Sequence, residues 1–253
     1  MNYDIQRAGL SRRLPAWLLD IILLVTLATG LMAGLSYVVD MDTHQKALDD
    51  VYVRYEQEFG IDFDITPEQF EAMTEEEIAK YDAAAEALSK DTQAQKTYEM
   101  LLNLTLITLS GGILGAFLIL EFAIPLILKN GQTLGKKVFG VALMRKDGIK
   151  VTPFMMFVRT ILGKFTLETM IPVLLVVAVM FGIVGIEGFL GIVVILLLQV
   201  VVGLVTRNKT GIHDLMACTV AVDMSSQMIF DSPEAKLEYH KRLHEENAAQ
   251  ADY

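Results

Sequence analysis

The chain has a single cysteine, Cys218, among its 253 residues. One cysteine cannot form an internal disulfide bond, so no covalent cross-link within the chain is possible. In the absence of a partner, such a residue is expected to act as a small buried hydrophobe.

The sequence also lacks the residue patterns of familiar catalytic and cofactor sites. The segment Gly131–Lys137 resembles a phosphate-binding loop, but it has one residue too few between its glycines and no Ser or Thr after Lys136. The segment that starts at Asp62 opens like a calcium loop, but it has Pro67 and Met73 where that loop needs glycine and glutamate. None of the histidines forms a ligand pair within an apolar run. We therefore predict no enzymatic activity, no cofactor, no metal centre and no nucleic-acid partner.

Long apolar runs dominate what is present, and hydrophobic residues make up 53% of the chain. A membrane span needs about 20 mostly apolar residues, and its backbone must close its own hydrogen bonds as a helix. The candidate spans are Leu14–Val39, Met100–Leu128, about Leu167–Val184, and Phe189–Val205. The first run is too long for the core of a signal peptide. The predicted fold class is all-α, a polytopic membrane protein with four transmembrane helices; a re-entrant pair formed by the last two runs is the alternative.

Charge is distributed unevenly around these runs, within a formal net charge of −10. Acids far outnumber bases from Asp40 to Glu99, whereas the segment Lys129–Lys164 contains Asp147 as its one acid. Further basic residues flank the first and last runs: Arg7, Arg12, Arg13, Arg207 and Lys209. Because Lys and Arg beside spans mark the cytoplasmic side, we predict that both termini are cytoplasmic.

These boundaries divide the chain into a membrane domain, residues 1–225, and a cytoplasmic tail, residues 226–253. The membrane domain contains an acidic insert, residues 40–98, which we predict to be helical and extracytoplasmic. Thr66 with Gln69, and Thr74 with Glu77, have the spacing of capping boxes at helix starts.

Asp20 is the only acid in the first run. A carboxylate at membrane depth costs roughly 2.5–3.5 kcal/mol on insertion scales and usually marks a buried pairing or a pathway. Arg13 precedes it by seven residues, which is nearly two helical turns and about 10 Å. Both side chains therefore lie on one face of the predicted helix, and Ala16 between them leaves room for a neighbouring segment.

Three motifs together resemble the RDD family of membrane proteins. They are Arg13-x-x-Ala16-x-x-x-Asp20, then Asn130-Gly-Gln-Thr-Leu-Gly-Lys-Lys137, then Gly211-Ile-His-Asp-Leu-Met-Ala217 with Thr219-Val220. The resemblance implies that Arg13, Asp20 and Asp214 are the arginine and two aspartates for which the family is named. Two features depart from it: Cys218 stands where the family usually has glycine, and the acidic insert enlarges a loop that is short in many members.

The resemblance implies a bacterial cytoplasmic membrane and suspected transport, with sodium/proton antiport as the activity described for some members. We therefore predict a transporter that exchanges monovalent cations for protons, in which Asp20 is the proton or cation site and Arg13 and Asp214 are charged partners. The alternatives are an Arg13–Asp214 ion pair that only fixes packing, with Asp20 held by a hydroxyl such as Thr133 or Thr219, and a scaffold that binds a protein or lipid through its insert or basic loop.

Two further polar residues are secondary candidates. Glu121 lies in the second run, and Pro125 after it would free a backbone carbonyl as an oxygen ligand; a carboxylate that only reaches the membrane surface is the other interpretation. Gln199 in the fourth run is expected to form an interhelical hydrogen bond or to contact substrate. Because four spans make a small bundle, we predict a homo-oligomer, most simply a dimer.

Overall fold

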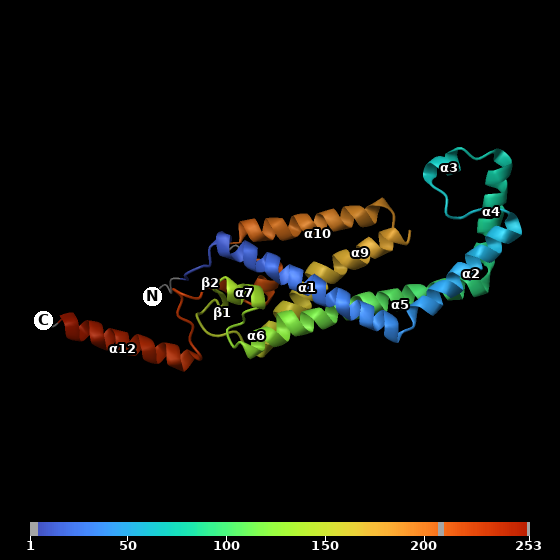
Figure 1. The fold of residues 1–253 in the computed structure, drawn as a ribbon. Helices are drawn as coiled ribbons and strands as arrows, with labels where there is room; N and C mark the ends of the chain where they lie inside the picture. The colour runs from blue at the N-terminus through green and yellow to red at the C-terminus, as the bar shows by residue number, and fades with distance from the viewer. Residues whose placement is uncertain (1–4, 207–209, 252–253) are drawn as a thin grey trace. The chain divides into compact units, whose positions relative to one another are not determined.

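The computed structural model describes residues 5–206 and 210–251. Two of the predicted basic markers, Arg207 and Lys209, lie outside this part of the chain. The described chain forms two compact units (Figure 1). The first unit contains the residues up to Ala28 and those from Ile113 onward. The second unit contains Thr29–Gly112.

Four helical segments are long and apolar enough to cross a membrane, in agreement with the predicted fold class. The first is α1 (Leu10–Val38) and the fourth is α10 (Ile186–Val205). The second is continuous through α5 (Thr92–Ala116), η1 (Phe117–Ala123) and α6 (Ile124–Ile127). The third is continuous through α8 (Pro153–Phe157), η2 (Val158–Met170) and α9 (Ile171–Met180). The third begins at Pro153, with Thr152 as its N-cap, and not at the predicted Leu167. Charged residues in its first half make that half look polar in the sequence. Those charges are paired inside the protein, so the helix continues through them.

Two of these segments contain π-helical stretches, η1 and η2, and each stretch ends just before a proline. Proline has no N–H, so the carbonyl four residues earlier loses its helical partner. Pro125 lies four residues after Glu121, and Pro172 lies four residues after Glu168. Short π-helical stretches inside α-helices are frequent at functional sites.

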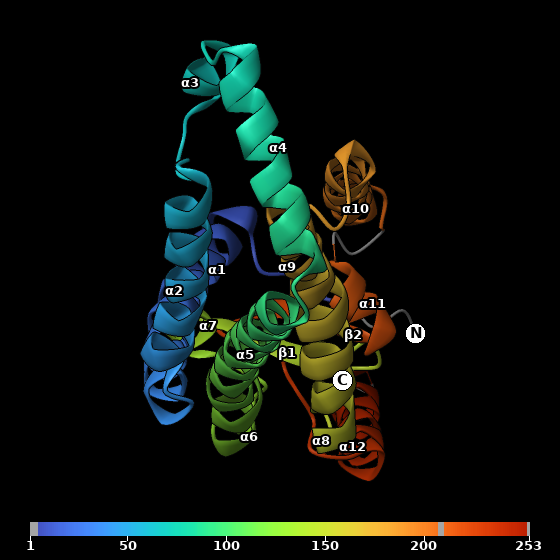
Figure 2. The same cartoon turned by 90° about the vertical axis from the view of Figure 1, so that its right-hand side faces the viewer.

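The first unit also contains a small antiparallel sheet, which pairs β1 (Val141–Arg145) with β2 (Thr219–Asp223). Residue Val141 faces Asp223, and Arg145 faces Thr219. Leu143 packs with Met156 of α8 in the core beneath the sheet. Two short helices precede the strands, α7 (Leu134–Val138) and α11 (Ile212–Met216). Figure 2 shows α11 beside the helix that runs from α8 to α9, and α11 packs closely on η2.

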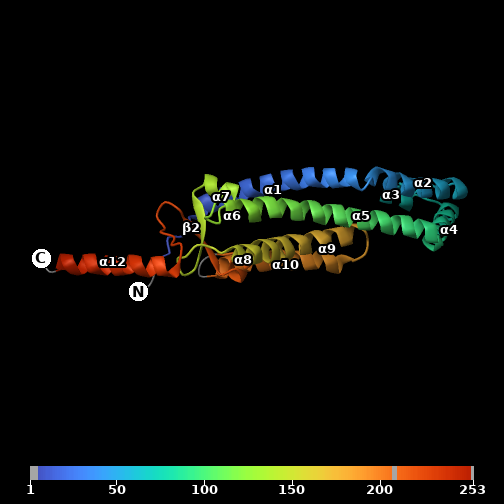
Figure 3. The same ribbon diagram turned by 90° about the horizontal axis from the view of Figure 1, so that it is seen from below.

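The hairpin of α9 and α10 places these helices side by side (Figures 1 and 3). After β2 the chain ends in helix α12 (Pro233–Ala251), so the predicted tail is helical. Cys218, expected to be buried, is instead exposed. It joins α11 to β2 with φ at 52°, a left-handed conformation that favours glycine.

The second unit contains the acidic insert, which is helical as predicted. Its helices are α2 (Met41–Phe59), α3 (Pro67–Glu71) and α4 (Glu75–Lys90). Both predicted capping boxes are present, at Thr66 and at Thr74. Val51, Tyr55 and Ala94 form a small core that ties α2 to the start of α5.

Candidate functional site

Asp20 is buried on α1, with 8% of its surface exposed, and three donors surround its carboxylate. The hydroxyl of Thr133 donates to Oδ2 at 2.5 Å, and the backbone N–H of Gly135 donates to Oδ1 at 2.7 Å. The ammonium group of Lys136 lies 3.3 Å from Oδ2. All three donors come from the start of α7, where the first N–H groups of a helix have no intrahelical acceptor. Of the two hydroxyls named in the packing-only alternative, Thr133 is the one that bonds Asp20. The Arg13–Asp214 ion pair of that alternative is not formed, since Asp214 pairs with Arg159.

Helix α7 approaches α1 this closely because position 135 is glycine. A Cβ atom there would lie 2.2 Å from the backbone oxygen of Ala16 and 2.8 Å from Oδ1 of Asp20. Ala16 is itself 1% exposed. The small residue expected to leave room for a neighbour therefore does so, and that neighbour is the short helix α7.

Lys136 links the Asp20 site to other charges of the first unit. Burial lowers the pKa of Lys136, and the positive charge of Lys164 adds to this effect; Glu121 and Asp20 oppose it, and the net pKa is about 8. Its ammonium group also donates to the hydroxyl of Thr133 at 3.0 Å. Lys136 is therefore held between α1 and the π-helical segments. A lysine that only marked the cytoplasmic side of the membrane would instead lie in open solvent.

Glu121 lies in η1 and is 4% exposed. Its carboxylate accepts a hydrogen bond from Lys164 of η2 at 2.7 Å. The carbonyl of Glu121 that Pro125 was predicted to free accepts the hydroxyl of Thr160 at 2.9 Å. Glu121 is thus a buried ion-pair partner and not a surface carboxylate, and its carbonyl already has a donor.

Asp214 lies on α11 and is 3% exposed. Its Oδ1 accepts a hydrogen bond from Nε of Arg159 at 2.8 Å and another from the hydroxyl of Thr219 at 2.7 Å. Burial raises the pKa of Asp214, but Arg159 and His213 lower it more, so it stays well below its usual range. Nη1 of Arg159 has no hydrogen-bond partner within the described residues.

His213 and Glu168 form a further pair between α11 and η2. The ring Nδ1 of His213 lies 2.8 Å from both carboxylate oxygens of Glu168. The backbone N–H of His213 donates to the same carboxylate at 3.0 Å. Glu168 therefore fastens α11 to the third span.

The three residues predicted to act together are not joined by direct ion pairs between them. Asp20 is paired with Lys136 and Asp214 with Arg159, whereas Arg13 lies half-buried two turns before Asp20 on α1. Gln199 of α10 does not form the expected interhelical bond through its Nε2, which is enclosed and has no partner among the described residues. Sequence reasoning missed the roles of Lys136, Arg159 and Lys164, whose position in a basic segment indicated orientation only.

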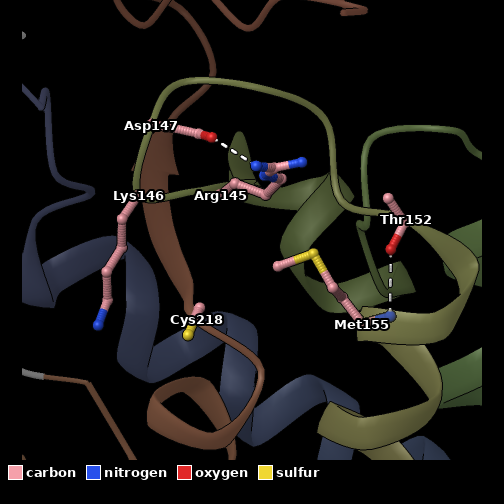
Figure 4. Close-up of a pocket in the computed structure, with 6 residues that line it drawn as sticks. All are labelled: Arg145, Lys146, Asp147, Thr152, Met155 and Cys218. Carbon is pink, nitrogen blue, oxygen red and sulfur yellow. Dashed lines mark hydrogen bonds and ion pairs between the residues drawn. The ribbon is translucent and has the colours of Figure 1, made fainter. Parts of the chain in front are cut away.

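A cavity of about 430 Å³ lies at the turn after β1 (Figure 4). Six residues line it: Arg145, Lys146, Asp147, Thr152, Met155 and Cys218. Arg145 is paired with Asp147 at 2.6 Å. The hydroxyl of Thr152 accepts the N–H of Met155, which caps α8. The cavity contains none of the predicted site residues. The residues that the structure describes also contain no cluster of three or more His, Cys, Asp or Glu side chains placed to hold a metal ion.

Four long apolar helices and a buried network of paired charges define a polytopic helical membrane protein. The model of the RDD family matches residues 7–218, which is most of the chain. The chain therefore belongs to the RDD family. No curated protein and no solved structure matches it.

Proposed function

We propose that this protein exchanges a monovalent cation for protons across the bilayer and that Asp20 is the carboxylate that carries the exchange. The observation that supports the proposal is the burial of Asp20 inside a membrane span, where it is 8% exposed. Asp20 lies roughly 15 Å along the axis of α1 from Leu10. A carboxylate at that position is costly to insert and is rarely present without a function.

An exchanger needs a group that a proton and a cation can occupy in turn, and a buried carboxylate is such a group because its protonation depends on the surrounding charges. The donors that face Asp20 come from a single short helix, α7. A cation that reaches Asp20 therefore has to displace Lys136 from the carboxylate. The exchange then couples occupancy of Asp20 to the contact between α7 and α1.

We assign different roles to the other two predicted residues. Asp214 is occupied by Arg159 and Thr219, so we place it in the structural frame and not among the ligands of the transported cation. Arg13 is half-buried at the start of α1, where we expect it to set the field around Asp20.

We further propose that both termini and α7 face the cytoplasm of a bacterial cell, that the acidic insert lies outside, and that the active form is a dimer. The excess of basic residues between the second and third spans supports this orientation. Reporter fusions at the C-terminus and within residues 62–66 test it, since they are expected to lie on opposite sides of the membrane.

Flux through purified protein in liposomes tests the exchange. A pH-sensitive dye inside the vesicles is expected to report proton movement when sodium or potassium is added outside. Asp20→Asn is expected to abolish this flux, whereas Asp223→Asn is expected to retain it. Asp223 is the matched control because its carboxylate is also paired with a cation, Arg12 at 2.9 Å, but lies outside the spans.

Two outcomes would contradict the proposal. One is folded wild-type protein that moves neither sodium, potassium nor protons, which would favour a scaffold that binds a protein or lipid. The other is full flux through the Asp20→Asn variant, which would remove Asp20 from the transport path.

A further inference from the structure

The buried charges of the first unit are paired one to one. Among the described residues, the pairs are Asp20 with Lys136, Glu121 with Lys164, Asp214 with Arg159, and Glu168 with His213. Arginine keeps its charge at every ordinary pH, and Lys136, with a pKa of about 8, loses its charge only on the alkaline side; histidine, in contrast, is neutral unless its ring binds a second proton. The charge of Glu168 is therefore balanced by a partner whose charge depends on pH.

Both ring nitrogens of His213 face carboxylates. Nδ1 of His213 faces Glu168 at 2.8 Å, and Nε2 lies 3.5 Å from Oδ2 of Asp214. A neutral imidazole has one N–H and one lone pair, so one of its nitrogens would face a carboxylate without a proton. The imidazolium ion directs an N–H at each carboxylate. Both carboxylates are largely buried, with side-chain exposures of 18% for Glu168 and 4% for Asp214.

Other charged groups around the ring are fixed by their own partners. From η2, Arg159 holds Asp214, and Lys164 holds Glu121 while it also acts on Glu168. From β2, the hydroxyl of Thr219 donates to Asp214. The carboxylate of Asp214 thus keeps its charge and its arginine over a wide pH range. The charge of the His213–Glu168 pair is the part of this group that depends on whether the ring holds its second proton.

The backbone of α11 at His213 also packs closely on η2. A Cβ atom on Gly163 of η2 would lie 2.6 Å from Cβ of His213 and 2.7 Å from its Cα. Cα and Cβ of His213 are therefore packed directly against η2, so any shift of this part of α11 changes that contact. A change in the charge of the ring acts directly on the docking of this helix.

From this geometry we infer that His213 is a proton-binding site, separate from Asp20, and that protonation of His213 holds α11 against η2. When the proton leaves, Glu168 loses its counter-charge and a lone pair of the ring faces a carboxylate, so α11 loosens. This inference does not depend on cation exchange, since it concerns the folded protein in either role.

Nitrogen NMR of the histidine rings in the full-length protein, reconstituted in nanodiscs, tests the inference directly. The chain has 4 histidines, so the variant His213→Gln suffices to identify the signal of His213. Spectra are recorded from about pH 5 to 8, where histidine in general changes charge, and we expect the ring of His213 to be the imidazolium ion whenever α11 is docked. Amide exchange of residues 210–217 is expected to accelerate when the ring loses its second proton, by roughly tenfold after correction for the intrinsic rate, because a buried carboxylate loses its partner.

Variants separate this effect from a general response to pH. His213→Gln and Glu168→Gln are each expected to abolish the extra acceleration, whereas His244→Gln, which changes an exposed histidine of α12, is expected to retain it. If His213→Gln fails to fold, the wild-type titration together with Glu168→Gln decides the matter. A ring that stays neutral throughout this range while α11 remains docked would overturn the inference. So would a ring that titrates while the exchange of α11 shows no added change.

Discussion

Replacement of Gly135 by alanine is the sharpest test of the contact that encloses Asp20. The added methyl group would meet the backbone oxygen of Ala16 at 2.2 Å and the carboxylate of Asp20 at 2.8 Å. Neither neighbour can yield easily, since one is helix backbone and the other is held by three donors. Helix α7 must therefore move away from α1.

The expected cost follows from two contributions. Insertion of a methyl group into a packed contact destabilises a protein by about 1–3 kcal/mol. Displacement of α7 also breaks the hydrogen bond from Gly135 to the carboxylate, and hydrogen bonds to charged groups contribute about 1.5–3 kcal/mol. The better helix propensity of alanine returns up to about 1 kcal/mol. We therefore expect a loss of about 2–5 kcal/mol in the free energy of unfolding.

Reversible unfolding of the purified protein in mixed micelles by a denaturing detergent measures this loss. Gly203→Ala is the matched control, because a Cβ atom at that position of α10 has no neighbour within 4 Å. We expect the control to be neutral or slightly more stable than the wild type. If Gly135→Ala were as stable as Gly203→Ala, the close docking of α7 on α1 would be refuted.

Four further changes test other parts of the structure. Asp214→Asn should cost about 3–5 kcal/mol in the same unfolding assay because it leaves Arg159 charged and buried, and a second change, Arg159→Met, should restore part of the loss. Thr160→Val should cost about 1–3 kcal/mol by leaving the carbonyl of Glu121 without a donor, whereas Thr160→Ser should cost less. Thr74→Ala should remove a capping box, at about 1 kcal/mol, and show faster amide exchange at the start of α4. The N–H groups of Gln93 and Ala94 hold the pKa of Asp91 below its usual value, so its contribution is present above about pH 4 and is lost as the pH falls through the folded-state value. Asp91→Asn should therefore make the amide exchange of the insert less sensitive to acid, and an unchanged response would contradict this role.

The spans and the insert were predictable because their signals are local. Apolar length identifies α1 and α10, and the spacing of a hydroxyl and a glutamate or glutamine identifies the starts of α3 and α4. The start of the third span was not predictable in the same way. Arg159, Lys164 and Glu168 make its first half look like a polar loop, and only their partners elsewhere in the chain neutralise them.

The candidate site was also predictable only where its signals are local in the sequence. The burial of Asp20 and its bond to Thr133 follow from the cost of a carboxylate in an apolar run. The choice of Lys136 over Arg13 as its cation depends on how α7 packs on α1, a contact between segments more than a hundred residues apart. A basic residue beside a span predicts orientation equally well whether it is solvated or buried, so Lys136 gave no separate signal.

The π-helical geometry of η2 has a consequence for deletion of a residue from this segment. Arg159 and Lys164 are five residues apart, which on an α-helix would turn them about 140° from each other. In a π-helix, hydrogen bonds from residue i to i+5 bring such residues over one another, so both cations reach inward partners. In an α-helix, two residues that are four positions apart are aligned nearly as well. A version of this chain shortened by one residue between the two cations could therefore wind as an ordinary α-helix and still direct both charges inward.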